Sequence, residues 1–159
     1  MSLKDKYNLV EENRYVFYLK QSKFDIVSLG VDLANYCREN NLLKGRICFH
    51  ENIEDPLQRM IIYHSKLYKI PVHYHKFKEE TLILLTGACS YKEYSREVSN
   101  NKNVLKLEKE IDIKPMEAIN IKQNTLHNLD IKGDILFLEF SIGPFSKEST
   151  TFADNLVTS

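Results

Sequence analysis

The stretch 71-PVHYHKFKEETLILLTG-87 contains the most informative spacing in the sequence. His73 and His75 are two residues apart, and residues i and i+2 of a β-strand point to the same face. Both side chains would therefore project into one interior. Glu80 follows a short polar bend, and the apolar run that ends at Gly87 indicates the next strand. The stretch predicts two neighbouring strands that bring two histidines and a glutamate together.

Length and composition limit the possible class of protein. The chain has 159 residues, of which 43% are hydrophobic, as expected of one globular domain. Lys plus Arg and Asp plus Glu both number 22, which gives no support for a nucleic-acid or anionic-membrane partner. No apolar run approaches the ~20 residues that span a bilayer. Three cysteines without CxxC spacing, and a polar N-terminal segment, favour a reduced, cytoplasmic protein.

The order of predicted elements favours an all-β fold. Tyr15–Lys20 is rich in aromatic and β-branched residues and predicts a strand, whereas Asp25–Asn40 has apolar residues at helical spacing. From Arg46 onward, short β-rich runs predict a sandwich or barrel. Turn-forming residues separate these runs at Asn52 to Pro56, Gly87, Ser99 to Asn101, Lys114-Pro115, Gln123-Asn124 and Lys132 to Asp134.

We expect three segments within one domain. Residues 1–45 would form an N-terminal strand and helix that pack on the barrel, and residues 46–145 would form the barrel itself. Residues 146–159 would form a polar tail, either loose or helical. The strands 82–85 and 135–138 are apolar on both faces, so their outer faces need cover. The N-terminal helix or a second subunit would supply it, and a homodimer is the hypothesis.

The spacing His73-x-His75-x4-Glu80-x6-Gly87 resembles the first motif of the cupin superfamily, and His127 lies where the second motif has its last ligand. The resemblance implies a double-stranded β-helix, or jelly-roll barrel, that binds one metal. Histidine nitrogens and a carboxylate oxygen suit a divalent transition metal such as Zn, Fe, Mn, Ni or Co. An HxH pair alone would more often lie at the surface or in a hydrogen-bonded core.

Glu79 competes with Glu80 as a ligand, but only Glu80 has six residues between it and Gly87, and adjacent strand residues point to opposite faces. The Pro-x-Gly of the second motif appears as Lys122-Gln123-Asn124, and Ile131 stands where the motif prefers Asn. Asn tolerates a left-handed backbone best after Gly, so we expect the turn to survive.

Further segments resemble the WbuC family of cupin-fold metalloproteins, across roughly Tyr15 to Asp154. They are Arg46–His50, Leu57–Met60, Pro71, Lys78 and Glu139-x3-Gly143-Pro144-Phe145. Val72 departs from the pattern, since the family tends to have Pro before the first histidine. The resemblance implies association with O-antigen or other surface-polysaccharide (lipopolysaccharide) gene clusters, and it implies no established reaction.

Substrate-binding and catalytic candidates lie on other strands. Arg46 and Lys78 are expected to bind substrate; Arg46 suits a carboxylate or phosphate. Arg46, Cys48 and His50 alternate on one strand and would share a face, so His50 is a candidate acid or base. The alternatives are that Arg46 pairs with an acid and that His50 packs at the strand end. Cys48 is expected in the core.

Glu139 and His64 complete the candidates. Glu139 lies in the apolar run ILFLEFSI, where a carboxylate must be exposed or paired. Facing the metal, it would suit proton transfer, and a salt bridge to Arg46 is the equal alternative. His64 shares parity with Met60 and Ile62, but no motif supports it, so we expect it at the surface or an interface.

Three functions fit these residues. The first is a metal-dependent isomerase or epimerase that acts on a sugar intermediate, with His50 or Glu139 moving the proton. The second is an iron-dependent dioxygenase, and the third is a non-enzymatic cupin that binds a small, sugar-like ligand. The fold cannot choose among them.

Overall fold

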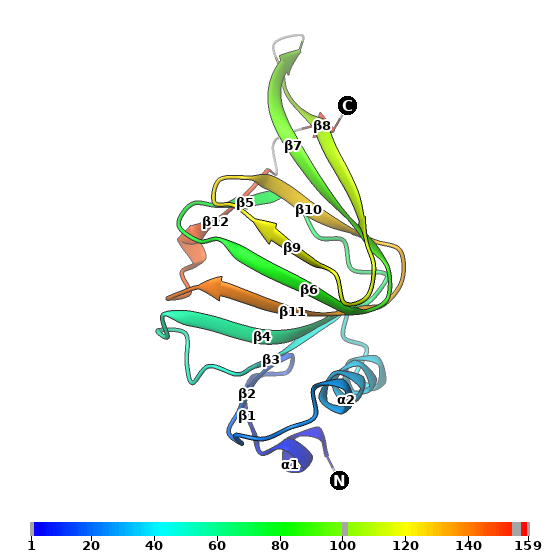
Figure 1. The fold of residues 1–159 in the computed structure, drawn as a ribbon, viewed down its shortest axis with the longest axis vertical. Coiled ribbons are helices and arrows are strands. Elements are labelled where there is room, and N and C mark those ends of the chain that lie inside the picture. Colours follow the sequence, from blue (N-terminus) through cyan, green and yellow to red (C-terminus); the bar gives the residue numbers. More distant parts are fainter. Residues whose placement is uncertain (1, 100–101, 154–156, 159) are drawn as a thin grey trace.

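The computed structural model describes residues 2–99, 102–153 and 157–158, which form two β-sheets that enclose a common core (Figure 1). Within these residues, one sheet has seven strands in the order β1-β2-β3-β4-β11-β6-β9, and the other has six in the order β12-β5-β10-β7-β8-β13. The predicted all-β jelly-roll barrel with an N-terminal helix is confirmed.

The seven-stranded sheet comprises β1 (Leu9–Asn13), β2 (Val16–Leu19), β3 (Lys44–Cys48), β4 (Leu57–His64), β6 (Glu80–Thr86), β9 (Ala118–Ile121) and β11 (Ile135–Ile142). The six-stranded sheet comprises β5 (His73–His75), β7 (Cys89–Ser99), β8 (Lys102–Ile113), β10 (Leu126–Ile131), β12 (Thr150–Phe152) and β13 (Val157–Thr158). The helices are α1 (Leu3–Tyr7), α2 (Ile26–Glu39) and the short 3₁₀ turn η1 (Lys147–Ser149).

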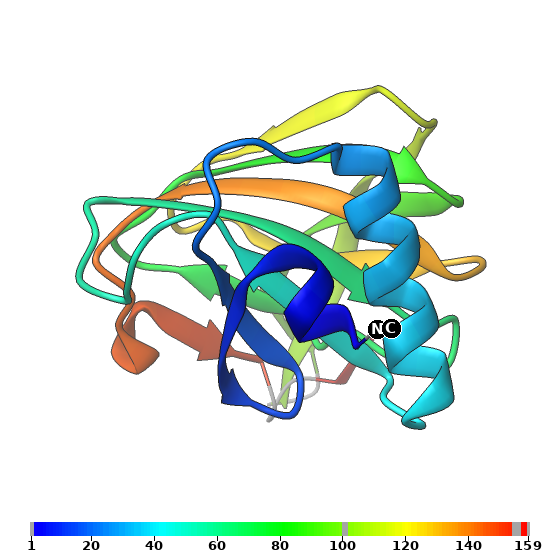
Figure 2. The same cartoon turned by 90° about the horizontal axis from the view of Figure 1, so that it is seen from below.

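Helix α2 covers the outer face of the seven-stranded sheet (Figure 2). It begins where the carboxylate of Asp25 accepts a hydrogen bond of 2.7 Å from the backbone N–H of Ser28, as an N-cap residue does. Leu29 and Leu33 of the helix are fully buried in one cluster with Leu136 of β11. The strand β11 is therefore apolar on both faces because α2 packs on one of them.

The inner faces of the two sheets form a second cluster. Ile62 and Phe137 of one sheet are buried there together with Leu129 of the other. Met60 and Cys48 belong to the same cluster, and burial raises the pKa of the Cys48 thiol to about 12. Both residues pack in the core, as expected from their types.

The polar tail differs from the prediction. Residues 146–159 were expected to be loose or helical, but Thr150–Phe152 forms strand β12 and pairs antiparallel with His73–His75 of β5. This pairing joins segments about 75 residues apart, which no local pattern reveals. Residues 154–156 and 159 of the tail lie outside the described residues.

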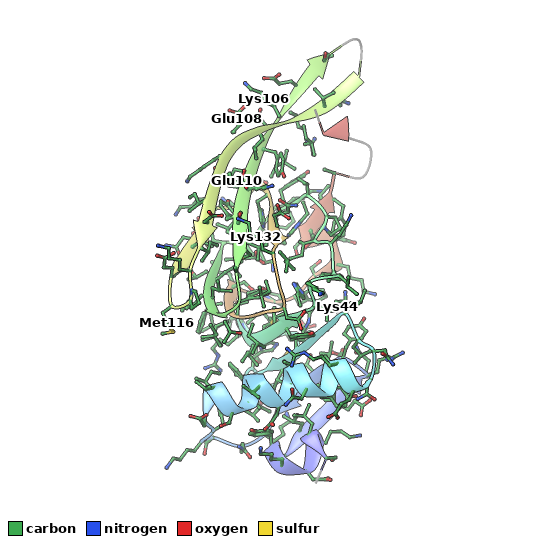
Figure 3. All side chains as sticks on the ribbon, turned by 90° about the vertical axis from the view of Figure 1, so that its right-hand side faces the viewer. Lys44, Lys106, Glu108, Glu110, Met116 and Lys132 are labelled. Atoms are coloured by element: carbon green, nitrogen blue, oxygen red, sulfur yellow. The ribbon has the colours of Figure 1, made fainter. Side chains whose placement is uncertain are left out.

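The hairpin of β7 and β8 extends well beyond the barrel (Figure 1). Both strands are longer than the β-rich runs in the sequence indicate, because charged pairs continue the ladder. Figure 3 shows Lys106, Glu108 and Glu110 along this hairpin, and Lys106 forms an ion pair of 3.1 Å with Glu97. The predicted turn at Ser99 to Asn101 falls between the two strands, but Asn100 and Asn101 are outside the described residues.

Among the described residues, no helix has the length and apolar character needed to cross a membrane.

Candidate metal centre

Three histidines meet between strands β5 and β10. His73 and His75 lie on β5, and His127 of β10 is the direct antiparallel partner of His73. One ring nitrogen of each histidine lies within 4.8 Å of those of the other two. The predicted histidine group is therefore assembled, with His75 and His127 almost fully buried.

The turn before His127 has the backbone predicted for it. Asn124 has a φ of 63°, the left-handed conformation expected where the cupin motif has glycine. The backbone N–H of Asn124 donates a hydrogen bond of 2.7 Å to the carbonyl oxygen of His75. This bond ties the turn to β5, so Asn124 helps to place His127 opposite the histidine pair.

The outer nitrogen of each histidine already has a partner. Nδ1 of His73 lies 2.8 Å from the carbonyl oxygen of Pro71, and Nδ1 of His127 lies 2.8 Å from that of Thr125. Nδ1 of His75 lies 3.0 Å from the hydroxyl oxygen of Thr150. When Nδ1–H donates to a carbonyl, Nε2 carries the lone pair, which is the tautomer that binds a metal.

Glu80, at the start of β6, completes the donor set. Its Oε1 lies 3.2 Å from Nε2 of His75, and its Oε2 lies 3.9 Å from Nε2 of His127. Nε2 of His75 is buried without a hydrogen bond of acceptable geometry among the described residues. Three imidazole nitrogens and one carboxylate, with one nitrogen left unsatisfied, fit a divalent transition metal.

Glu79 does not share this position. Its carboxylate is half exposed and lies 3.6 Å from Nζ of Lys122, away from the histidines. Glu80 is almost fully buried. Burial alone would raise the pKa of Glu80, but the contact with His75 and the charge of Lys78 outweigh it and hold the pKa below its ordinary value. Glu80 is thus kept ionised, as a ligand must be.

Lys78 joins two carboxylates beside the histidines. Its Nζ lies 2.5 Å from Oε1 of Glu80 and 3.6 Å from Oε1 of Glu139. Burial raises the pKa of Glu139, and the nearby charge of Glu80 raises it further, although Lys78 and Arg46 oppose the shift. Glu139 therefore faces the predicted metal ligands and pairs with Lys78; it forms no ion pair with Arg46.

A cavity of about 260 Å³ opens over the histidines. Besides His73, His75, Glu80 and His127, its wall includes Lys44, Arg46, His64, Tyr68, Lys78 and Glu139. The candidates Arg46, Lys78 and Glu139 are thus gathered in one space with the four predicted ligands. Ligand pockets begin at about 300 Å³ for drug-sized molecules, so this one suits a smaller ligand.

His50 is not part of this wall among the described residues. Strand β3 ends at Cys48, so the alternation that would have placed His50 beside Arg46 stops before it. The ring of His50 is buried, and its Nδ1 lies 3.0 Å from the carbonyl oxygen of Arg59. The structure therefore places His50 at the strand end, the second of the two positions considered from the sequence.

His64 and Thr150 are cavity residues that the sequence did not indicate. His64 was expected at the surface or an interface; the structure places it half-buried in the cavity wall, with its ring 5.4 Å from that of Phe137 and its Nδ1 buried. The parity of His64 with Met60 and Ile62 was the available signal. Thr150 reaches His75 only through the β5–β12 pairing, for which the sequence has no local signal.

Comparison with known proteins supports the fold. The family model for a domain of unknown function, DUF6016, matches residues 31–105. A search of curated protein sequences finds no match. The capsular polysaccharide assembling protein CapF from Staphylococcus aureus is similar, with a TM-score of 0.52, 16% identity, and coverage of 72% of this chain and 32% of that chain.

The DMSP lyase DddQ from Ruegeria pomeroyi DSS-3 also has a TM-score of 0.52, with 13% identity and coverage of 74% of this chain and 55% of that chain. A cupin superfamily protein from Desulfitobacterium hafniense DCB-2 has a TM-score of 0.47 and 12% identity, with coverage of 62% of this chain and 76% of that chain. The fold is that of a cupin. The chain spans about a third of the length of CapF, and the resemblance to the WbuC family stays a prediction.

Proposed function

We propose that this protein is a metal-dependent isomerase or epimerase that acts on a sugar intermediate of surface-polysaccharide synthesis. The observation that carries the proposal is the placement of Glu139 and Lys78 in one cavity with His73, His75, Glu80 and His127. A carboxylate that moves a proton would then lie beside a group that polarises the substrate. Isomerisation by proton transfer beside a carbonyl can use this combination.

Each residue has one role in the proposal. His73, His75, Glu80 and His127 would hold one divalent transition metal, which supplies Lewis-acid polarisation of a carbonyl when bound. Glu139 takes a proton from the carbon beside that carbonyl. In isomerisation it returns the proton to the neighbouring carbon while the hydroxyl proton moves from one oxygen to the other. In epimerisation water delivers a proton to the opposite face of that carbon, and Glu139 passes its own proton to solvent. The net reaction leaves atoms and electrons unchanged. Lys78 holds Glu139 in place and offers an N–H to a substrate oxygen.

The sugar class rests on two further points. The cavity of about 260 Å³ suits a ligand of monosaccharide size. The structurally similar CapF is described as a capsular polysaccharide assembling protein, and the resemblance to the WbuC family points to polysaccharide gene clusters as well. We assign the proton transfer to Glu139 rather than to His50 because His50 lies outside the described cavity wall.

Two measurements test the proposal. Metal content by inductively coupled plasma mass spectrometry, on protein without a histidine tag, should be near stoichiometric in the parent and lost in His73→Ala and Glu80→Ala. Metal-loaded parent in D₂O should then exchange a carbon-bound proton of a sugar probe, followed by NMR. Glu139→Gln should slow this exchange by about 10²-fold or more, the usual contribution of a general base.

Glu79→Gln is the matched control, because it removes the neighbouring carboxylate that faces Lys122. It should leave both metal content and exchange unchanged. Metal binding without exchange or conversion of any sugar probe would refute the isomerase and leave a ligand-binding cupin. Oxygen consumption with Fe(II) and a small organic substrate would instead identify a dioxygenase.

A further inference from the structure

Two cations of the cavity wall have no carboxylate partner among the described residues. Lys44 and Arg46 are half-buried on strand β3, whereas Lys78 is paired with Glu80 and Glu139. Nζ of Lys44 lies 3.4 Å from the hydroxyl oxygen of Tyr68 and 5.2 Å from the centre of its ring. These contacts orient the ammonium group but leave its charge uncompensated. Lys44 lies where β3 begins, close to the end of α2 (Figure 3).

A buried polar atom lies beside these cations. Nδ1 of His64 is buried and has no hydrogen-bond partner within the described part of the chain. Burial, together with the charges of Arg46 and Lys44, lowers the pKa of His64 to about 3, so the ring is neutral near pH 7. A buried nitrogen without a partner costs free energy unless a ligand or water satisfies it.

The strand register places this group at the far end of the cavity from Glu80. Lys44 pairs with His64, and His64 pairs with Ile135 at the start of β11. Glu80 pairs with Ser141 near the other end of β11. The six steps from Ile135 to Ser141 span about 20 Å at the rise of a strand, and Arg46, which pairs with Ile62 opposite Phe137, lies between these two ends. The lining therefore has a metal-binding end and a cationic end.

We propose that Lys44, Arg46 and His64 form a subsite for an anionic group, so that the substrate is an anionic sugar with its carboxylate or phosphate held away from the metal ligands. This inference rests on the proposed function and names the substrate class of the same site. Arg46 binds two anion oxygens through its guanidinium group, Lys44 supplies a second charge, and Nδ1–H of His64 donates to the anion. The bound anion would satisfy the buried nitrogen and compensate both cations.

Binding of sugar probes to the metal-loaded protein tests the subsite. Dissociation constants for glucose, glucuronate and glucose 6-phosphate would be measured by protein-observed NMR. The parent should bind glucuronate or glucose 6-phosphate at least about tenfold more tightly than glucose, the effect of one charge-assisted hydrogen bond. The anionic probe that binds more tightly shows whether the subsite prefers a carboxylate or a phosphate.

Three variants locate the effect. Arg46→Gln and Lys44→Gln should each weaken the binding of the preferred anionic probe by about tenfold, without changing the binding of glucose. His64→Phe keeps an aromatic ring against Tyr68 and Phe137 but removes the ring nitrogen, so it should also weaken the binding of the anionic probe. Lys69→Gln is the matched control: it removes an equal charge from an exposed residue outside the described cavity wall and should change nothing.

The outcomes separate this inference from the proposed function. No preference for an anionic probe over glucose, or a preference that survives both Arg46→Gln and Lys44→Gln, would overturn the subsite. Either result would leave metal content and proton exchange untouched. If the parent binds no metal, or catalyses no proton exchange, but still prefers the anionic probes, the isomerase proposal is overturned. The subsite would then be supported as a binding site.

Discussion

Two residues with a positive φ lie at turns near the predicted metal ligands. Asn124 has a φ of 63° just before His127, and Gly87 has a φ of 92° at the end of β6. A side chain at Gly87 would collide with the backbone carbonyl of Asp134, so this position requires glycine. Asn124 is less restricted, because Asn tolerates the left-handed region.

The turn at Asn124 supports a stability prediction. Asn124→Gly should leave the free energy of unfolding unchanged or slightly raised, whereas Asn124→Ala should lower it by about 1 kcal/mol, because alanine is disfavoured in the left-handed region. Urea denaturation would measure both. Equal stability of the two variants would show that the positive φ is not maintained in solution.

A single carboxylate connects several elements. Asp134 accepts hydrogen bonds from the hydroxyl of Tyr63 on β4 (2.9 Å), the backbone N–H of Lys66 (2.9 Å) and Nε of Arg38 on α2 (3.1 Å). Burial would raise the pKa of Asp134, but these hydrogen bonds outweigh it and hold the pKa below its ordinary value of 3.8. The turn before β11 is thereby tied to the helix that covers the sheet.

This pKa shift predicts a pH dependence. A carboxyl group whose pKa is lowered on folding stabilises the protein above its unfolded value, and that contribution is lost as the pH falls through the folded value. Asp134→Asn should therefore be less stable than the parent at pH 7. Thermal unfolding should show the difference shrinking as the pH falls below about 4. A difference that is the same at pH 7 and pH 3 would contradict this explanation.

The packing of α2 on the seven-stranded sheet should contribute strongly to stability. Leu33 has no exposed surface, and Leu33→Ala should lower the free energy of unfolding by about 2–5 kcal/mol, because it leaves a cavity. Val27 lies on the same helix and is 64% exposed. Val27→Ala should lower the free energy of unfolding only slightly, and urea denaturation would measure both variants. A small effect at Leu33 would mean that α2 is not firmly docked.

In the molecule as a whole, the N-terminal and C-terminal segments both contribute strands to the two sheets. Strand β2 pairs with β3, and β12 pairs with β5. We still propose one domain in which residues 1–45 pack on a barrel of residues 46–145 and residues 146–159 follow as a tail. The tail strand β12 places Thr150 against His75 of the candidate metal centre.

Metal binding should stabilise the whole fold. Lys78 compensates the charge of Glu80, so we expect the protein to stay folded without metal. A ligand at about 100 times its dissociation constant contributes about 2.7 kcal/mol, which raises the melting temperature by about 5–10 °C. Differential scanning fluorimetry with Zn, Mn, Fe, Ni or Co would show the rise. His127→Ala should abolish it, and a rise of the same size in that variant would argue against the site.

The homodimer also remains a prediction. Val98 and Leu107 on the projecting hairpin are 74% and 43% exposed, and apolar side chains at such a position suit a subunit contact. Analytical ultracentrifugation at micromolar concentration should show a dimer, and Leu107→Glu should weaken it. Sedimentation of the parent as a monomer alone would remove the hypothesis.

Local patterns were sufficient for much of this protein. Alternation and turn residues predicted an all-β fold with one N-terminal helix, and motif spacing selected His73, His75, Glu80 and His127. The elements and the spacing from His73 to Glu80 depend on residues close together in the chain, where side-chain period and backbone preference act directly. His127 was selected by its resemblance to the second cupin motif. The choice of Glu80 over Glu79 followed from the cupin motif, because only Glu80 has six residues between it and Gly87, and the period of two then places Glu79 on the other face.

Long-range pairing decided the rest. The sequence left the partner of Glu139 open, contained no motif that places His64 in the cavity wall, and had no signal for Thr150. Each depends on strands distant in the chain: β6 beside β11, β3 beside β4, and β12 beside β5. Such contacts are set by the closure of two sheets around a shared core, which no local period encodes. The sequence alone therefore predicted the metal ligands, and only the tertiary structure decided which charges surround them.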